Sequence, residues 1–167
     1  MLRDSALKAS EVDCDVVAVD APAHPMNRTL LSYWQSKIGA DGIVRRSAID
    51  PFDVRQALGG MFIVEPADGG RDLLYRLVGS ANELRLGIKC TGRRFTECYG
   101  PRMAADQIAF HNRVFATGKP AFLRGRLVGL DVEHADFEAC YLPMKTDDGR
   151  DQIMGGLFDM AELGSMI

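Results

Sequence analysis

The chain has 167 residues, of which 47% are hydrophobic and 26% are charged, and its formal net charge is −3 at pH 7. This composition predicts one globular domain with a hydrophobic core, and the acidic balance argues against a nucleic-acid-binding surface. No apolar run approaches the roughly 18 residues that a membrane span requires, and no signal-peptide pattern opens the chain. The four cysteines have neither CxxC nor metal-ligand spacing, so we expect free thiols, no metal site, no membrane contact and a cytoplasmic protein.

The beginning of the chain carries two prolines and no sustained hydrophobic period, which predicts a flexible N-terminal arm over residues 1–28. After the arm the pattern changes, because Leu30, Trp34 and Ile38 recur every four residues and form one apolar stripe of a short helix. We therefore expect the folded domain to span residues 29–162, with an arm that is dispensable for its folding.

A second helix is predicted after Asp50, which can cap it, with Pro51 at the first helical position and Gly59 at the end. Two strands follow at residues 61–66 and 73–79. The sequence "ADGG" lies between them, and this composition is typical of a hairpin turn.

The longest predicted helix starts at Pro101 and ends at Gly118, after a short helix and a loop. Three further strands complete the chain: "AFLRGRLVGL", "DFEACYLPMK" and "QIMGGLFDM". Hairpin-length connections make neighbouring strands antiparallel, and the long helix must cross over one face of the sheet. The sequence thus predicts an α+β domain with a five-stranded antiparallel sheet.

The third and fourth expected strands form a hairpin if "GLDVEHA" is the loop between them. One face of that hairpin then carries mostly apolar or small residues: Leu123, Gly125, Leu127, Phe137, Ala139 and Tyr141. This face should meet the helices, and a pocket lined by Tyr141 can open at the small residue Gly125. The opposite face carries Arg124 and Arg126, and the register pairs Arg126 with Glu138 across the strands.

Two polar residues of the long helix, Gln107 and His111, fall at the centre of its apolar arc. A buried polar group without a partner costs about 1–3 kcal/mol, so both side chains require partners. One interpretation is a structural pair that bonds to backbone or to water. The other is that the two residues bind the polar part of a small ligand in a mostly apolar pocket.

The last expected strand contains Gly155 and Gly156 in its interior, where glycine packs nothing and loses much backbone freedom. Such glycines indicate a bulge, tight packing against an aromatic ring, or the close approach of a ligand. The expected register turns Gly156 inward with Met154 and Phe158, across the pocket from the polar pair. Gly155 then faces outward.

This order of elements resembles the PAS domain, and more specifically the small single-PAS proteins of alphaproteobacteria. The resemblance extends over roughly residues 29–160, through a tryptophan-bearing helix followed by "IDP", "YRLVG" and "TGRR". It implies a sheet in the order 2-1-5-4-3 with helices on one face and an N-terminal helix. It also implies a sensory or adaptor domain in signal transduction that acts through protein partners and holds no catalytic residues.

The resemblance leaves the cofactor unknown. Some PAS domains bind haem through a histidine on the long helix, and His111 is the candidate axial ligand for that alternative. Flavin photosensor members carry a reactive cysteine just before an Arg-Phe pair, and neither Cys90 nor Cys98 stands there. A small-molecule enzyme on a related α+β scaffold is a further alternative, although the inward arc of the long helix offers no acid.

A sensor without an output module must act on another protein, so we expect a signalling partner and a homodimer. The first helix is one candidate contact, with Leu30, Tyr33 and Trp34, because one stripe of so short a helix must be buried. The outer sheet face is the other, with Arg124 and Arg126. The alternative is that the first helix packs on its own sheet.

Overall fold

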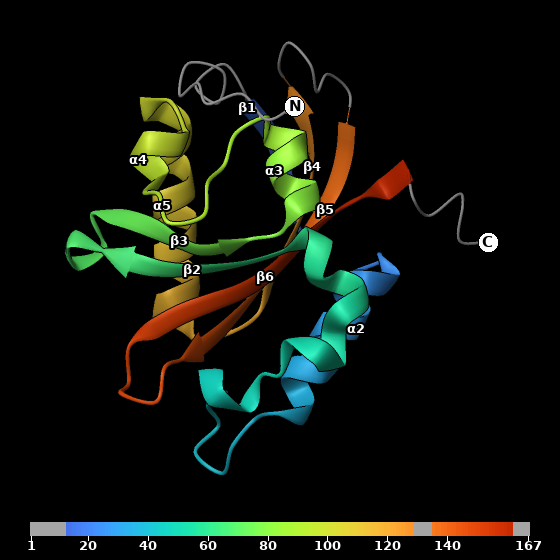
Figure 1. The fold of residues 1–167 in the computed structure, drawn as a ribbon, viewed down its shortest axis with the longest axis vertical. Coiled ribbons are helices and arrows are strands. Elements are labelled where there is room, and N and C mark those ends of the chain that lie inside the picture. The colour runs from blue at the N-terminus through green and yellow to red at the C-terminus, as the bar shows by residue number, and fades with distance from the viewer. Residues whose placement is uncertain (1–12, 129–134, 162–167) are drawn as a thin grey trace.

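The computed structural model describes residues 13–128 and 135–161. Within these residues the strands form a six-stranded antiparallel sheet in the order β1-β4-β5-β6-β2-β3 (Figure 1). The strands are β1 (Asp13–Val19), β2 (Met61–Ala67), β3 (Asp72–Val78), β4 (Ala121–Val128), β5 (Ala135–Lys145) and β6 (Asp151–Asp159). The five strands expected from the sequence keep the expected relative order, and β1 is added beside β4.

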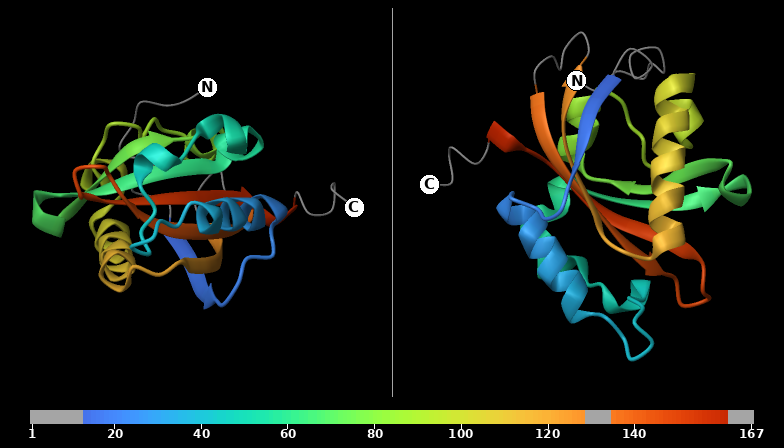
Figure 2. Two further views of the ribbon diagram at one scale, coloured as in Figure 1. Left: turned by 90° about the horizontal axis from the view of Figure 1, so that it is seen from below. Right: turned by 180° about the vertical axis from the view of Figure 1, so that it is seen from behind.

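The helices lie on both faces of this sheet, not on one face as expected. The α-helices are α2 (Pro25–Ser36), α3 (Ser80–Leu86), α4 (Phe95–Cys98) and α5 (Pro101–Thr117). Three 3₁₀ helices accompany them: η1 (Arg46–Ala48), η2 (Pro51–Gly60) and η3 (Asp68–Gly70). Figure 1 shows α4 and α5 at the left and α2 at the lower right, and Figure 2 shows α2 and α5 well apart when the molecule is seen from behind.

Each face of the sheet carries its own hydrophobic core. The core beneath α4 and α5 includes Phe62, Leu73, Phe95, Phe137, Ala139, Tyr141 and Ile153. The core beneath α2 and η2 includes Leu30, Trp34, Met61, Cys140, Leu142, Met154 and Phe158. Because side chains alternate along a strand, the central strands β5 and β6 contribute to both cores, and this explains their nearly continuous burial.

The capping signals in the sequence mark the helices correctly. The Asp50 carboxylate accepts a hydrogen bond from the Phe52 amide at 2.9 Å and caps η2, although this element is a 3₁₀ helix. Pro51 stands at its first position, as expected. Helix α5 begins at Pro101 and ends before Gly118, whose left-handed backbone (φ 63°) closes the helix.

The expectation of a flexible arm over residues 1–28 is wrong for its second half. Strand β1 pairs with β4 along its whole length, and α2 already begins at Pro25. An edge strand has only one paired neighbour and buries few side chains, so its hydrophobic signal is weak. Val16 and Val17 are indeed 41% and 63% exposed.

A buried carboxylate fixes the start of α2 on the sheet. Glu138 of β5 is fully buried and accepts hydrogen bonds from the backbone amides of Ala23 (2.7 Å) and His24 (2.9 Å). The side-chain amide of Asn27 donates to the same carboxylate at 3.1 Å, and the Arg124 guanidinium lies 3.6 Å from it. These donors compensate the buried charge and tie residues 22–28 to the core.

The pairing of β4 with β5 differs from the expected register by two residues. Arg124 stands opposite Glu138, and Arg126 stands opposite Asp136, to which its Nε donates at 2.9 Å. The expected Arg126–Glu138 pair is therefore wrong. Because the side-chain period of a strand is two, the shift leaves every side chain on the face where it was expected.

Candidate functional site

A cavity of about 560 Å³ lies between the sheet and helices α3 and α5. This volume is within the range of small-molecule sites in proteins. Its walls are mostly aliphatic and aromatic, with Val16 and Ala18 from β1, Phe62 from β2, Val78 from β3, Met103 and Phe110 from α5, Leu123 from β4, Phe137 and Tyr141 from β5, and Leu157 from β6. Edge strand β1, which the sequence did not reveal, is thus part of the wall.

Two tyrosines of the cavity wall are joined through their hydroxyl groups. The hydroxyl oxygens of Tyr75 and Tyr99 lie 2.6 Å apart, so one phenol donates a hydrogen bond to the other. The ring of Phe95 stacks on Tyr75 with 4.3 Å between centroids. Burial raises the pKa of both tyrosines well above its ordinary value, so both phenols are protonated at neutral pH.

The arginine in the last turn of α3 is engaged by protein groups. Arg85 donates to the Asp159 carboxylate at 3.0 Å and also to the side-chain oxygen of Asn82. The Asn82 amide in turn donates to the Gly60 carbonyl at 2.8 Å. Since Arg85 already has a carboxylate partner, it is not an uncompensated positive charge facing the cavity.

His111 occupies the inward position expected from the helical pattern, and it is only 2% exposed. Its Nδ1 lies 2.7 Å from the Gln107 carbonyl oxygen, and because a carbonyl only accepts, Nδ1 carries the proton. Burial lowers the pKa of His111 to about 4, so the ring is neutral at pH 7 and Nε2 is an acceptor. Within residues 13–128 and 135–161 that buried Nε2 has no hydrogen-bond partner.

Three aromatic rings meet the His111 imidazole edge-on. Phe95 and Tyr141 lie at 5.2 Å between centroids, and Phe110 lies at 5.8 Å. This packing favours the structural interpretation of His111. Gln107 supplies its backbone carbonyl to the histidine, while its half-buried side chain contributes to the cavity wall.

The inward assignment of Gly156 is wrong, because Gly156 lies on the α2 face of the sheet. A Cβ built there would come within 2.6 Å of the Asn27 Oδ1 and the Leu30 Cδ1. Its strand neighbours Met154 and Phe158 belong to the same α2-side core. The absent side chain makes room for helix α2, so Gly156 is a packing feature and not a cavity residue.

The space beside Gly155 and beside Gly125 is also filled by protein atoms. A Cβ on Gly155, which faces the α5 side and not outward, would collide with the Phe62 ring. A Cβ on Gly125 would lie 2.6 Å from the Asp15 carbonyl oxygen and 2.7 Å from a Val16 methyl group. The expected pocket opening at Gly125 is therefore closed by strand β1.

The residues expected on the first helix as a partner surface lie mostly inside the domain. Leu30 is fully buried and Trp34 is 7% exposed, with its indole Nε1 donating to the Pro143 carbonyl at 2.8 Å. Tyr33 is half-buried, and its hydroxyl donates to the Asp53 carboxylate at 2.9 Å. The stripe packs on its own sheet because that face is apolar.

Sequence reasoning thus found Gln107, His111 and Tyr141 in the cavity wall but missed the tyrosine pair. The spacing of Leu73 and Tyr75 on one face of a strand was a usable signal for Tyr75. Nothing in the sequence brings Tyr99, which precedes α5, next to it.

The described part of the chain holds no group of three or more metal-ligating side chains placed to bind an ion. Across the same residues, every helix is too short or too polar to span a bilayer.

The family comparison agrees with this architecture. The sequence profile of the PAS domain matches residues 22–158, which include every described helix and, apart from Asp159 at the end of β6, the strands β2 to β6. No curated protein matches the chain. A match over most of the length supports a sensory or signalling type of domain. The chain belongs to the PAS domain family.

Proposed function

We propose that this PAS domain is a sensory module that binds a small, mostly apolar molecule in the cavity between the sheet and α5. The observation that carries the proposal is the cavity itself, with about 560 Å³ lined by aliphatic and aromatic side chains and a few convergent polar groups. A molecule bound there would gain dispersion contacts with these side chains.

Occupancy of the cavity would be communicated through the elements that enclose it to a signalling partner. Strand β1 is suited to this role, since Val16 and Ala18 line the cavity while Val17 is 63% exposed on the opposite side. The half-exposed Arg124 and Arg126 lie on the neighbouring strand β4 and remain our candidates for a partner or homodimer contact.

The haem alternative receives less support than an organic ligand. Axial ligation requires an accessible imidazole nitrogen, whereas the Nε2 of His111 is buried and aromatic rings pack around the imidazole. An absorption spectrum of the purified protein distinguishes the two, because bound haem gives a Soret band.

The test is to fill the cavity. Leu157 projects into it from the central strand β6, so Leu157→Trp should leave the domain folded and abolish binding of the uncharged fluorophore N-phenyl-1-naphthylamine. Leu84→Trp is the matched control, because Leu84 is exposed on α3 and the same ring is added to the surface. Fluorescence titration measures binding, and a thermal melt confirms folding.

Two results would count against the proposed function. Wild-type protein that gives no saturable fluorescence increase would lack an apolar site. Equal binding by wild type and Leu157→Trp would place the site elsewhere. Should Leu157→Trp fail to melt cooperatively, Val78→Phe fills the same cavity from β3.

A further inference from the structure

The hydrogen bond between Tyr75 and Tyr99 leaves one of their two hydroxyl protons without an acceptor among the described residues. Tyr75 and Tyr99 carry two O–H donors, and the bond between them, with 2.6 Å between the oxygens, uses one. In the part of the chain that the structure describes, neither hydroxyl makes a second hydrogen bond. One phenolic O–H therefore remains as a donor in the cavity wall.

That remaining donor is a strong one in an apolar setting. A phenol that accepts a hydrogen bond becomes a better donor, because hydrogen-bonded groups polarise one another in a low-dielectric interior. The Phe95 ring stacks on Tyr75 and offers no acceptor oxygen or nitrogen to the remaining proton. A ligand that supplies an acceptor oxygen would satisfy the pair, and a purely hydrocarbon ligand would not.

The charge of the surroundings favours an uncharged ligand. Arg85 is already bound to the Asp159 carboxylate, and the other arginine of the wall, Arg113, is exposed to solvent. An anion beside the tyrosines would have no unpaired buried cation to compensate it, which is costly in an apolar cavity.

We infer that the cavity takes an uncharged, largely apolar molecule with one acceptor oxygen, such as a ketone or aldehyde carbonyl, and that the Tyr75–Tyr99 pair donates the hydrogen bond to it. This inference rests on the proposed function, since it names the ligand class of the same cavity. His111, whose Nδ1 bonds to the Gln107 carbonyl, belongs to the wall.

The test compares two probes that differ only at the acceptor. 2-Acetylnaphthalene carries a carbonyl, and 2-isopropenylnaphthalene has a methylene group in its place with nearly the same shape. Wild-type protein should bind the ketone roughly fivefold to tenfold more tightly, the ratio expected of one hydrogen bond. Tyr75→Phe combined with Tyr99→Phe should abolish the preference and leave the affinity for the hydrocarbon unchanged.

We expect the fold to tolerate the double variant. Replacing both partners of a buried hydrogen bond by apolar groups of the same shape is nearly neutral for stability, whereas a single change leaves one hydroxyl able to donate to the ligand. Tyr33→Phe is the matched control, because Tyr33 bonds to Asp53 on the α2 side and is absent from the cavity. It should keep the full preference for the ketone.

Each outcome separates this inference from the proposed function. Equal affinity of wild type for both probes, or a preference that survives in the double variant, would overturn the role of the tyrosine pair while leaving the cavity as a binding site. Failure of wild type to bind either probe would overturn both.

Discussion

Gly155 and Gly156 show that the structural role of a single residue depends on its neighbours in space. Each glycine marks a point where another group approaches the backbone, as the sequence indicated, but the group is a protein side chain in both cases. Phe62 covers Gly155, and Leu30 with Asn27 covers Gly156. The sequence shows that glycine is unfavourable inside a strand at these two positions, but it does not identify the group that occupies the space beside the backbone.

His111 provides a test at the scale of one ionisable group. Its pKa in the folded protein is lowered by burial to about 4, below the value of about 6.5 in the unfolded chain. Between these values the unfolded state binds the proton, so the free energy of unfolding falls as the pH falls. From pH 7 to pH 5 the histidine should cost the wild type about 2 kcal/mol.

His111→Phe cannot titrate, and its stability should therefore fall by about 2 kcal/mol less over the same interval. Urea unfolding of both proteins at pH 7 and pH 5 measures the difference, and the other titrating groups cancel in the comparison. Identical losses in the two proteins would show that the imidazole is protonated as readily in the folded state as in the unfolded one.

Helices with clear capping residues and strands with clear hydrophobic runs could be predicted from the sequence. The sequence placed η2 and α5 by their prolines and terminal glycines, and it placed the five strands from β2 to β6 by their hydrophobic runs. It did not place α4, which has only four residues, or edge strand β1. Both elements are held by tertiary contacts that leave little local signal.

Strand β1 should contribute to stability, contrary to the expectation of a dispensable arm. A chain without residues 1–20 loses the pairing of β1 with β4 and the part of the cavity wall formed by Val16, so its melting temperature should fall by roughly 5 °C or more. A chain that starts at residue 13 is the matched control, because it keeps β1 entire. Equal melting temperatures for the two truncated chains would show that β1 adds nothing to the fold.

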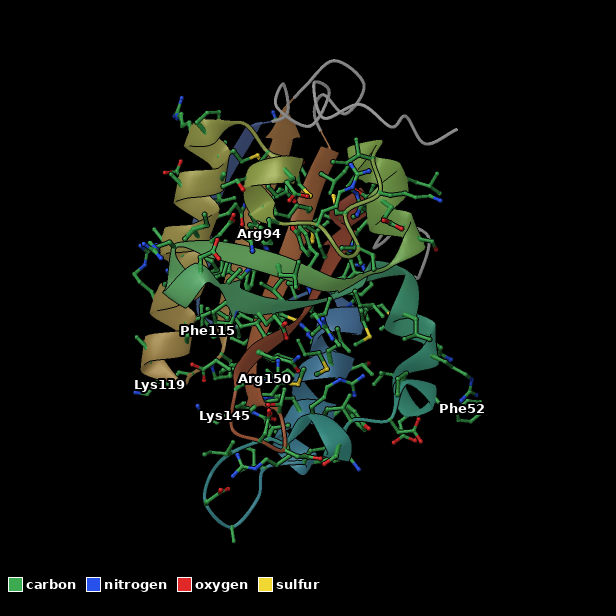
Figure 3. All side chains as sticks on the ribbon, turned by 60° about the vertical axis from the view of Figure 1, so that its left-hand side comes forward. Phe52, Arg94, Phe115, Lys119, Lys145 and Arg150 are labelled. Atoms are coloured by element: carbon green, nitrogen blue, oxygen red, sulfur yellow. The ribbon has the colours of Figure 1, made fainter. Side chains whose placement is uncertain are left out.

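Phe52 is the most exposed large hydrophobic side chain in the described part of the chain. It projects from η2 into solvent, as Figure 3 shows, and the Arg55 guanidinium lies 4.8 Å from its ring centroid. Its exposure requires no functional explanation, since single apolar residues are common on protein surfaces.

For the whole molecule, the central difference between expectation and structure is that the sheet has two covered faces. The sequence correctly predicted an α+β fold and the PAS family. It was wrong in treating the face of the sheet beneath α2 as an open surface, because that face carries a second hydrophobic core. Period-two alternation tells which residues share a face and is silent on what covers that face. The cavity was predicted on the correct side, and its walls emerged only from the contacts between α5, β1 and the sheet.

The two faces also allow the most direct test of the account, whose central claim is that the cavity between the sheet and α5 binds a small molecule. Methyl NMR spectra recorded during a titration with 2-acetylnaphthalene report where the probe lies. We expect shifts at the cavity methyl groups of Met103, Leu123 and Leu157, and none at Leu30, Leu142 and Met154 in the α2-side core. Shifts confined to the α2 side, or no saturable shifts in either core, would contradict the account.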